Sequence, residues 1–350
     1  MKMLSFWGNK RVFVTGHTGF KGSWLCKTLE MAGAEVTGYA LNPSSKPNLY
    51  ELCKPSGHSV IGDIRDFDSL HAAFLEARPE IAIHMAAQPL VIDSYTMPRY
   101  TYDVNVMGTV NFMECVRLIG NVKSVLNVTT DKVYLNQERE QGYREHERLC
   151  GSDPYSNSKS CSELVTSTYK SSYFDQAGVA VSTARSGNVI GGGDFSVNRL
   201  IPDCAKALGK GETIKVRNPD SIRPYLHVLD SIFAYLLIAE KQYADPSFSD
   251  TYNIGPVEHG CVKGRELVNA FCEAWGGGEW EHLPTNDPPE SNILRLDCSK
   301  IKRMLGWMPV WDIDRAVNET AFWYRAYYQN SDSATSIMRQ QIEEFMEVTE

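Results

Sequence analysis

The feature that most constrains this chain is a glycine-rich turn between a strand and a helix near its start. A β-branched and aromatic run, Arg11–Thr15, precedes the turn, and an apolar-periodic stretch, Phe20–Met31, follows it. The turn itself reads Gly16-His17-Thr18-Gly19-Phe20-Lys21-Gly22, a G-x-x-G-x-x-G pattern. Glycines permit close approach to a pyrophosphate, and the helix N-terminus offers N–H groups and a positive dipole to that anion. Glycines can also do no more than shape a turn, but the flanking strand and helix favour a bound dinucleotide, contacted by all seven residues.

Strands and helices alternate through the first half of the chain. Further strands are expected at residues 35–39, 60–62, 81–84, 124–128 and 179–184, with helical patterns at 66–77, 99–118 and 154–174. Elements in this order imply βαβ units and a parallel sheet, which right-handed crossovers wind doubly. The predicted fold class is therefore α/β, a Rossmann-like doubly wound parallel sheet with a smaller α/β C-terminal lobe.

The length of 350 residues suggests two domains, or one large domain with a lobe. We expect a cofactor-binding domain over 1–187, to which 228–256 return, and a substrate-binding lobe built from 188–227 and 257–350. The turn-rich stretches 187–194, 209–223 and 276–289 are interpreted as loops of the lobe. The last twenty residues contain five acids and one base, which indicates a solvated amphipathic helix.

Composition excludes several classes of protein. Lys plus Arg is 35 and Asp plus Glu is 43, a formal charge of −8, which offers no basic footprint for nucleic acid. The longest apolar runs, such as 232–239, are too short to cross a bilayer, and no signal-peptide block precedes the first strand. Nine cysteines, with no Cys-x-x-Cys pair, indicate reduced thiols in a cytoplasmic protein without a metal site.

Residues for the adenosine half of a dinucleotide are less decisive. The second strand ends in Ala40-Leu41-Asn42, with no acid for the ribose and no arginine for a 2′-phosphate, so NAD and NADP both stay open here. Asn42 could hydrogen-bond a ribose hydroxyl. Asp63, followed by Ile64, suits an adenine contact or equally belongs to a helix N-cap region. After the fourth strand we expect backbone groups to line the cofactor channel at Ala86, Ala87 and Gln88.

Tyr155 and Lys159 form the first candidate catalytic pair. Asp153 is a suitable N-cap and Pro154 suits the first helical position, so the two side chains, four residues apart, lie on one helix face. A neighbouring ammonium lowers the pKa of a tyrosine and makes it a usable base. A lone Tyr-x-x-x-Lys occurs by chance on many helices, but here it follows a dinucleotide turn and several βα units.

A second candidate set is Thr130-Asp131-Lys132, directly after the apolar strand 124–128. Ligands of doubly wound sheets bind at the carboxyl ends of the strands. A hydroxyl, a carboxylate and an ammonium together can donate and accept protons. The alternative is a turn with a surface ion pair.

These motifs together resemble the extended short-chain dehydrogenases/reductases, and specifically the nucleotide-sugar 4,6-dehydratases. The resemblance covers nearly the whole chain and includes the glycine turn, the Tyr155/Lys159 pair and the tracts 84–88, 105–109, 252–256 and 305–307. Most members carry Asp-Glu after the threonine, whereas Asp131-Lys132 resembles the CDP-glucose 4,6-dehydratase subfamily, as do the tracts 15–24 and 88–91. His84 and Asn105 are interpreted as structural rather than reacting groups.

The resemblance implies an NAD-dependent hydro-lyase that forms a 4-keto-6-deoxy sugar nucleotide for deoxysugar and O-antigen precursors. Tyr155, assisted by Lys159, is expected to remove the O4 proton while hydride passes from C4 to the nicotinamide, with Thr130 bonded near O4 and the pair also contacting the cofactor. Lys132 is expected to remove the C5 proton, for which its amine must be neutral, and Asp131 to protonate the departing 6-hydroxyl. Hydride then returns to C6.

The resemblance also suggests substrate contacts at Gln88, Asn188, Arg199, Arg223 and Arg295. Arginine suits a diphosphate. The less favoured alternative for Asn188 is the cap of a glycine-rich loop, and the alternative for Arg199 or Arg223 is a structural ion pair. Tyr225-Leu226 occupies the position where a Trp-Gln pair is more usual in the family. The identity of the nucleobase or of the sugar substituents therefore stays open. Relatives dimerise through the helices at 99–118 and 154–174, so we expect a homodimer.

Three other functions stay open at this stage. A sugar-nucleotide 4-epimerase shares the fold and the Tyr/Lys pair, but it needs no elimination acid, so Asp131-Lys132 favours dehydration. A regulatory module that only senses NAD often loses the tyrosine or lysine, and both are present here. A 4,6-dehydratase of another nucleotide sugar is only weakly excluded.

Overall fold

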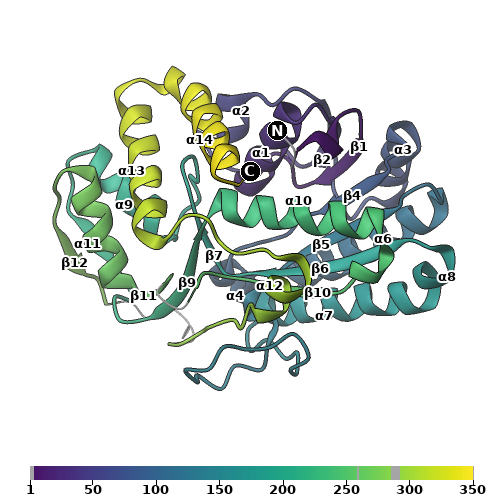
Figure 1. Ribbon diagram of the computed structural model, residues 1–350. Helices are drawn as coiled ribbons and strands as arrows, with labels where there is room; N and C mark the ends of the chain where they lie inside the picture. Colours follow the sequence, from purple (N-terminus) through teal and green to yellow (C-terminus); the bar gives the residue numbers. More distant parts are fainter. Residues whose placement is uncertain (1–3, 258–259, 285–291, 350) are drawn as a thin grey trace.

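The structure is a computed structural model that describes residues 4–257, 260–284 and 292–349. Its centre is a seven-stranded sheet in the order β10-β6-β5-β4-β1-β2-β3, with every neighbouring pair parallel (Figure 1). The strands are β1 (Arg11–Thr15), β2 (Glu35–Ala40), β3 (His58–Ile61), β4 (Ile81–His84), β5 (Ser124–Thr130), β6 (Ala180–Ser186) and β10 (Thr251–Ile254). The strand order reverses between β1 and β4, which is where ligands bind in doubly wound sheets. The predicted fold class is confirmed.

The helices fall into two sets along the chain. The first comprises α1 (Phe20–Met31), α2 (Leu49–Cys53), α3 (Phe67–Ala77), α4 (Val91–Thr96), α5 (Pro98–Tyr102), α6 (Gly108–Ile119), α7 (Pro154–Tyr169) and α8 (Asp175–Ala177). The second comprises α9 (Leu200–Gly209), α10 (Val228–Ala244), α11 (Gly264–Trp275), α12 (Ser299–Leu305), α13 (Ile313–Gln329) and α14 (Ala334–Thr349). Two π-helical turns, η2 (Asp103–Met107) and η4 (Lys170–Phe174), join α5 to α6 and α7 to α8.

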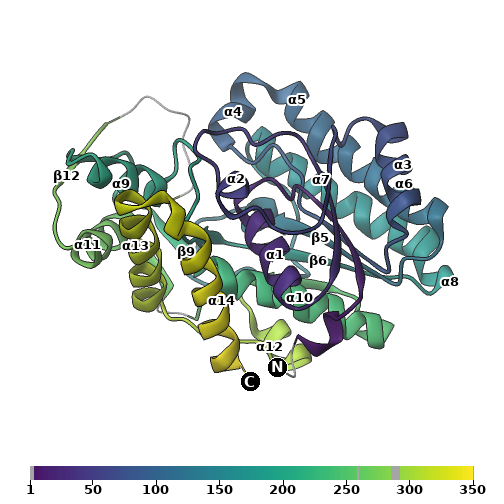
Figure 2. The same cartoon turned by 90° about the horizontal axis from the view of Figure 1, so that it is seen from above.

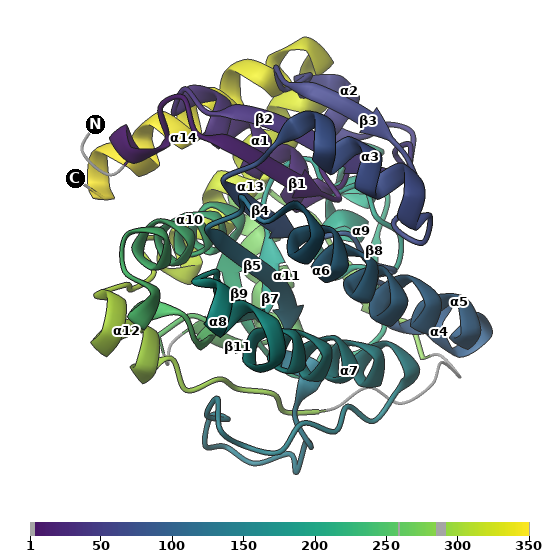
Figure 3. The same ribbon diagram turned by 90° about the vertical axis from the view of Figure 1, so that its right-hand side faces the viewer.

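The main sheet is buried on both faces. Helices α3, α6 and α7 cover one face, while α1 and α10 cover the other (Figure 3). Every residue of β5 and β6 is buried, as expected for parallel strands with helices on either side. The carboxyl end of β5 and the start of α7 place side chains at the carboxyl ends of the strands.

Five short strands lie outside the main sheet. Strands β7 (Asn188–Ile190), β9 (Ile222–His227) and β11 (Cys261–Lys263) form one small sheet, and β8 (Ile214–Val216) pairs in parallel with β12 (Trp280–His282). The expectation of loops at 187–194, 209–223 and 276–289 is wrong where β7, β8 and β12 occur. Four of these five strands have only three residues, too few to show a period of two. They lie beside α9, α11 and α13 (Figure 2). The division into a domain and a lobe at the stated boundaries stays a prediction, and residues 285–289 of the stretch 276–289 lie outside the described residues.

The C-terminal helix α14 is amphipathic, as predicted. Its buried face includes Ile337, Met338, Ile342 and Phe345, and it packs against α1, α2 and α13 (Figure 2). The helix therefore ties the end of the chain to the glycine-turn helix. No helix in the described ranges is long and apolar enough to span a membrane.

Candidate active site

The glycine turn lies against the loop after β4, and its glycines are sterically required. Gly16 has φ +78°, and a Cβ there would lie 2.8 Å from the backbone nitrogen of Ala86. A Cβ on Gly22 would lie 2.1 Å from the carbonyl oxygen of Gly16. Gly19 is the N-cap of α1 and provides no side-chain cap, so the backbone N–H groups of the first helical turn are left for an anion. This cradle fits the pyrophosphate of a dinucleotide.

Side chains in the turn mostly face the protein rather than a ligand. The His17 ring packs over Gly38 and its Nε2 lies 2.7 Å from the Ser59 hydroxyl. Burial lowers the pKa of His17 to about 4, so the ring is neutral near pH 7. Thr18 donates its hydroxyl proton to the carbonyl oxygen of Leu41 at 2.8 Å. The Thr18 hydroxyl is therefore used within the protein, whereas the buried His17 Nδ1 has no hydrogen-bond partner among the described residues.

The three residues expected to contact adenosine, Asn42, Asp63 and Ile64, lie in different environments. Asn42 is exposed, whereas Ile64 is buried and packs close to Gly108. The Asp63 carboxylate accepts a hydrogen bond from Arg65 Nη2 at 2.7 Å, which lowers the pKa of Asp63. The N-cap alternative for Asp63 is wrong, because Asp66 caps α3.

The loop after β4 is held by hydrogen bonds within the protein. The Ala86 N–H donates to the Thr15 hydroxyl at 3.1 Å. Asn105 accepts from the Gln88 N–H at 2.8 Å and donates to the Gln88 carbonyl at 3.1 Å. The Gln88 side chain itself donates to Thr101 at 3.0 Å. Asn105 is therefore structural, as expected, and Gln88 uses its amide internally, while Ala86 and Ala87 are half-buried.

His84 ends β4 and is also structural. It is buried, with Nδ1 2.8 Å from the Thr15 hydroxyl and Nε2 3.3 Å from the Thr109 hydroxyl. Burial, with repulsion from Lys159, lowers the pKa of His84 to about 3. A neutral ring between two hydroxyls has no free nitrogen for catalysis.

This geometry predicts acid sensitivity. The unfolded chain protonates His84 below about pH 6.5 while the folded protein resists protonation down to about pH 3, so stability is full above pH 6.5 and is lost as the pH falls. We expect a contribution of roughly 1.4 kcal/mol per pH unit to the slope of unfolding free energy. Urea unfolding between pH 6.5 and 4.5 should give a shallower slope for His84→Asn, and an unaltered slope for His146→Asn, an exposed control. Parallel slopes for all three proteins would contradict the prediction.

Tyr155 and Lys159 lie on the first turns of α7, where Asp153 caps the helix and Pro154 begins it. Lys159 is buried and its Nζ donates to the carbonyl oxygen of Val128 at 3.3 Å. Burial, with repulsion from Lys21, lowers the pKa of Lys159 to about 8.

The prediction that Lys159 lowers the pKa of Tyr155 is wrong for the groups of the protein chain alone. Burial raises the pKa of Tyr155 to about 12, and the groups that act to lower it are the hydrogen bond with Thr130 and the charge of Arg199. The reason is geometric, because the lysine ammonium is directed to the end of β5 rather than to the phenol.

The carboxyl end of β5 continues into the short 3-10 turn η3 (Asp131–Val133). Thr130 donates to Asp131 Oδ1 at 2.9 Å, and Asp131 Oδ2 is buried with no hydrogen-bond partner. Burial raises the pKa of Asp131, against the opposing charges of Lys132, Arg223 and Lys21. A buried carboxyl of this kind favours its protonated form and can act as an acid. The alternative of a surface ion pair is wrong for Asp131.

The predicted substrate residues surround this centre unevenly. Arg199 begins α9 and pairs with Asp194 at 3.1 Å, and its charge reaches Tyr155. Arg223, on β9, is buried; its Nη1 donates to the carbonyl of Asn292 at 3.2 Å and its charge reaches Asp131. The structure thus brings Lys21, Thr130, Asp131, Lys132, Tyr155, Lys159, Arg199 and Arg223 within electrostatic reach of one another.

Two other substrate candidates have no such link to the centre. Asn188 is half-buried on β7. Arg295 is half-buried, and its Nε is a buried donor with no hydrogen-bond partner among the residues that the structure describes. An unpaired guanidinium nitrogen is costly to bury, which favours a ligand for Arg295.

Sequence reasoning missed a buried ion pair beside the catalytic residues. Glu163, on α7, accepts from Arg185, on β6, at 2.9 and 3.0 Å. Glu163 lies four residues after Lys159, so its position on the catalytic face was a signal that could have been followed. Arg185 had no comparable signal within a strand of buried residues.

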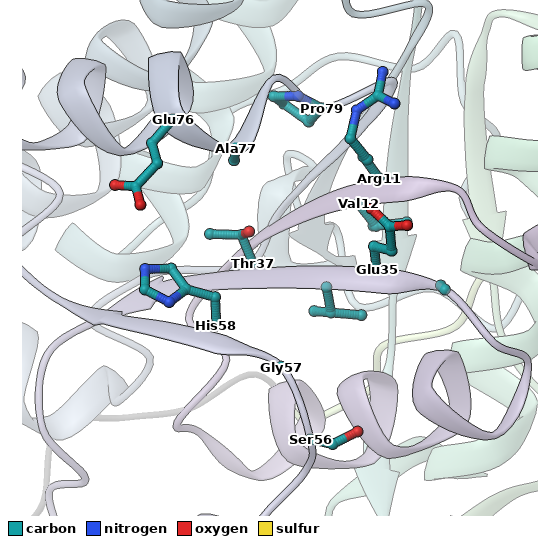
Figure 4. A pocket seen from close by; sticks show the side chains of 12 residues that line it. Arg11, Val12, Glu35, Thr37, Ser56, Gly57, His58, Glu76, Ala77 and Pro79 are labelled. Atoms are coloured by element: carbon teal, nitrogen blue, oxygen red, sulfur yellow. The ribbon is translucent and has the colours of Figure 1, made fainter.

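A separate hollow lies at the amino ends of the strands, opposite the carboxyl ends that carry the candidate site. Arg11, Glu35 and His58, at the starts of β1, β2 and β3, line it together with Glu76 on α3 (Figure 4). None of the predicted site residues lines this hollow. The carboxyl ends of the strands therefore form the candidate active site.

Comparison with known proteins shows the family to which this chain belongs. The family model described as GDP-mannose 4,6 dehydratase matches residues 13–320, and the chain belongs to that family. The resemblance to nucleotide-sugar 4,6-dehydratases is thereby confirmed. The CDP-glucose 4,6-dehydratase of Salmonella typhimurium is 44% identical over 99% of this chain and 98% of its own length.

Solved structures show the same fold. The UDP-glucose 4-epimerase of Thermus thermophilus, solved with NAD, is 26% identical with a TM-score of 0.78 over 90% of this chain and 98% of its own. The dTDP-glucose 4,6-dehydratase of Bacillus anthracis, also solved with NAD, is 22% identical with a TM-score of 0.76 over 93% of this chain and 99% of its own.

Proposed function

We propose that this chain converts CDP-D-glucose to CDP-4-keto-6-deoxy-D-glucose, using NAD. The observation that carries the proposal is the Asp131-Lys132 pair beside Tyr155 and Lys159, in a chain 44% identical to a CDP-glucose 4,6-dehydratase. When bound, NAD accepts hydride from C4 of the sugar and returns it to C6. The glycine cradle at Gly16 and Gly22 would hold the pyrophosphate of this cofactor.

Tyr155 and Thr130 handle the oxygen at C4. The Tyr155 phenolate takes the O4 proton as hydride leaves C4, and Thr130, which hydrogen-bonds Tyr155, orients the sugar hydroxyl. Since burial opposes formation of a phenolate, a positive charge is needed close to it. Arg199 already acts in this direction, and a bound oxidised nicotinamide would add positive charge.

Asp131 and Lys132 carry out the elimination. The new ketone at C4 acidifies the C5 proton, and Lys132 is the base that we assign to its removal. Asp131 gives its proton to the 6-hydroxyl, which leaves as water, so the C5–C6 double bond forms as the C6–O bond breaks. Return of hydride to C6 and of a proton to C5 completes the product.

The arginines on the lobe side meet the anionic part of the substrate. Arg199 and Arg223 already reach the catalytic centre electrostatically, and the unpaired Nε of Arg295 gives a third donor. We assign the diphosphate to these residues, with Asn188 at the edge of the same site.

One experiment separates the possible functions. The purified protein is incubated with CDP-, dTDP-, UDP- and GDP-hexoses, and 4-keto-6-deoxy products are measured. We expect turnover with CDP-glucose in preference to the others. No turnover with CDP-glucose would overturn the assigned substrate, and a C4 epimer formed without loss of water would replace dehydration with epimerisation.

We also propose that two copies of the chain associate through the helical segments 99–118 and 154–174. These segments expose five large apolar side chains, which a monomer rarely leaves uncovered. They are Tyr102, Met107, Leu118, Leu164 and Tyr173. None of the nine cysteines forms a disulfide within the described residues, which fits a reducing compartment, so we propose a cytoplasmic enzyme that supplies precursors of deoxysugars and O-antigen.

A charge at this surface should separate the copies. Leu164, on α7, is 57% exposed, and Leu164→Arg is expected to give a monomer by sedimentation at micromolar concentration. Leu75→Arg is the matched control, because Leu75 on α3 is 53% exposed but lies outside the proposed interface. If both variants sediment as the wild-type protein does, this surface is not the interface.

A further inference from the structure

The buried pair of Glu163 and Arg185 has no part in the reaction just described, yet it touches both halves of the site. Glu163 is 3% exposed and Arg185 4% exposed. Two parallel hydrogen bonds join them, from Arg185 Nε to Oε1 at 3.0 Å and from Nη2 to Oε2 at 2.9 Å. This bidentate arrangement fixes orientation as well as distance.

Glu163 connects Arg185 to the half of the site that oxidises C4. It lies one turn beyond Lys159 and two beyond Tyr155, on the same face of α7. Its carboxylate also accepts hydrogen bonds from the hydroxyls of Thr129 and Thr183, the latter at 2.8 Å. Because Thr129 directly precedes Thr130, this carboxylate joins the catalytic helix to the end of β5.

Tyr134 connects Arg185 to the half of the site that eliminates water. Arg185 Nη1 donates to the Tyr134 hydroxyl at 2.8 Å, and that hydroxyl donates to Asn253 Oδ1 at 2.6 Å. Tyr134 is buried and follows η3, the turn that carries Asp131 and Lys132. Asn253 in turn donates to the carbonyls of Tyr143 and Asp297 at 2.7 and 3.2 Å.

We propose that Arg185 is a positioning residue that couples the two halves of the site, through Glu163 to the helix of Tyr155 and Lys159 and through Tyr134 to the turn of Asp131 and Lys132. The planar guanidinium presents several donors in one fixed geometry, which a lysine does not. The oxidising and eliminating groups must act on adjacent carbons of one sugar, so their relative placement decides the rate. This inference rests on the proposed dehydration.

Tyr134→Phe tests the eliminating arm alone, because it keeps the ring and removes the hydroxyl. Oxidation at C4 is expected to keep its rate, while elimination slows about tenfold to hundredfold, the effect expected of a small misplacement. Reduced cofactor then accumulates during turnover with CDP-glucose and is measured by its absorbance. A role in stability alone would lower both rates together and leave this accumulation unaltered.

Tyr252→Phe is the matched control. Tyr252 is a buried tyrosine on β10, directly before Asn253, and its hydroxyl donates to the carbonyl of Phe248 at 2.6 Å rather than to Arg185. The control is expected to show no accumulation of reduced cofactor. Accumulation equal to that of Tyr134→Phe would overturn the proposal.

Arg185→Lys keeps the positive charge but removes the planar guanidinium. It therefore tests the contact to Glu163 and the contact to Tyr134 together. We expect it to slow C4 oxidation as well as elimination, unlike Tyr134→Phe. If wild-type protein turns over CDP-glucose and neither variant changes the ratio of the two rates, the coupling role of Arg185 is overturned. If the wild-type protein forms no 4-keto-6-deoxy product at all, it is the proposed function that has failed.

Discussion

Asp131→Asn is expected to stop the reaction at the 4-keto stage. Asparagine has no acidic proton to give to the 6-hydroxyl, so product formation should fall by roughly 10²–10⁴-fold. Oxidation at C4 should persist, because Tyr155 and Thr130 are untouched and asparagine Oδ1 can still accept the Thr130 hydrogen bond seen at 2.9 Å. Rapid mixing with CDP-glucose should then show a burst of reduced cofactor that does not decay.

A second buried carboxylate provides the control for this experiment. Asp230, on α10, is buried, and burial raises its pKa to about 7. Its Oδ1 accepts from the Val310 N–H at 2.6 Å, outside the candidate active site. Asp230→Asn should therefore form product without any lasting burst of reduced cofactor. If Asp131→Asn forms product at the wild-type rate, Asp131 is not the elimination acid.

The parts of this fold that the sequence predicts best are those with a local physical cause. The strand Arg11–Thr15 and the helix Phe20–Met31 occur at their predicted bounds, because an apolar run, a glycine turn and a helical period follow one another directly. Tyr155 and Lys159 share a helix face for the same local reason. Spacing thus predicts correctly that the two proposed proton-transfer residues lie on one helix face.

The parts that could not be predicted depend on contacts between distant segments. Arg185 and Glu163 are 22 residues apart, and the Tyr134 hydroxyl bonds a residue 119 positions away. Arg185 lies in a fully buried strand, where its sequence position indicates no partner. The pKa of Tyr155 was misjudged for a related reason, since burial by surrounding elements raises it and the Lys159 amine is directed to the Val128 carbonyl. Local spacing gives the identity of the reacting groups, and tertiary packing decides their protonation.

Gly16→Ala is expected to weaken NAD binding strongly. Alanine at φ +78° is strained, and its Cβ would lie 2.8 Å from the Ala86 nitrogen, so the cost is roughly 2–5 kcal/mol. The folded protein can relieve this by moving the turn away from Ala86, which spoils the cradle that the pyrophosphate needs. The cost is then met on binding, and at roughly 1.4 kcal/mol per tenfold it weakens NAD affinity by about 30-fold or more. Titration calorimetry with NAD measures this loss.

Gly178→Ala separates backbone strain from steric conflict in this experiment. Gly178 has φ +70°, close to that of Gly16, but a Cβ there would have no atom within 4 Å. The control should lose roughly 1–2 kcal/mol of stability and bind NAD as the wild-type protein does. Equal NAD affinity for Gly16→Ala and wild-type protein would show that the turn does not hold the pyrophosphate. A loss shared equally by both variants would instead assign the effect to strain, because only Gly16 lies against the loop after β4.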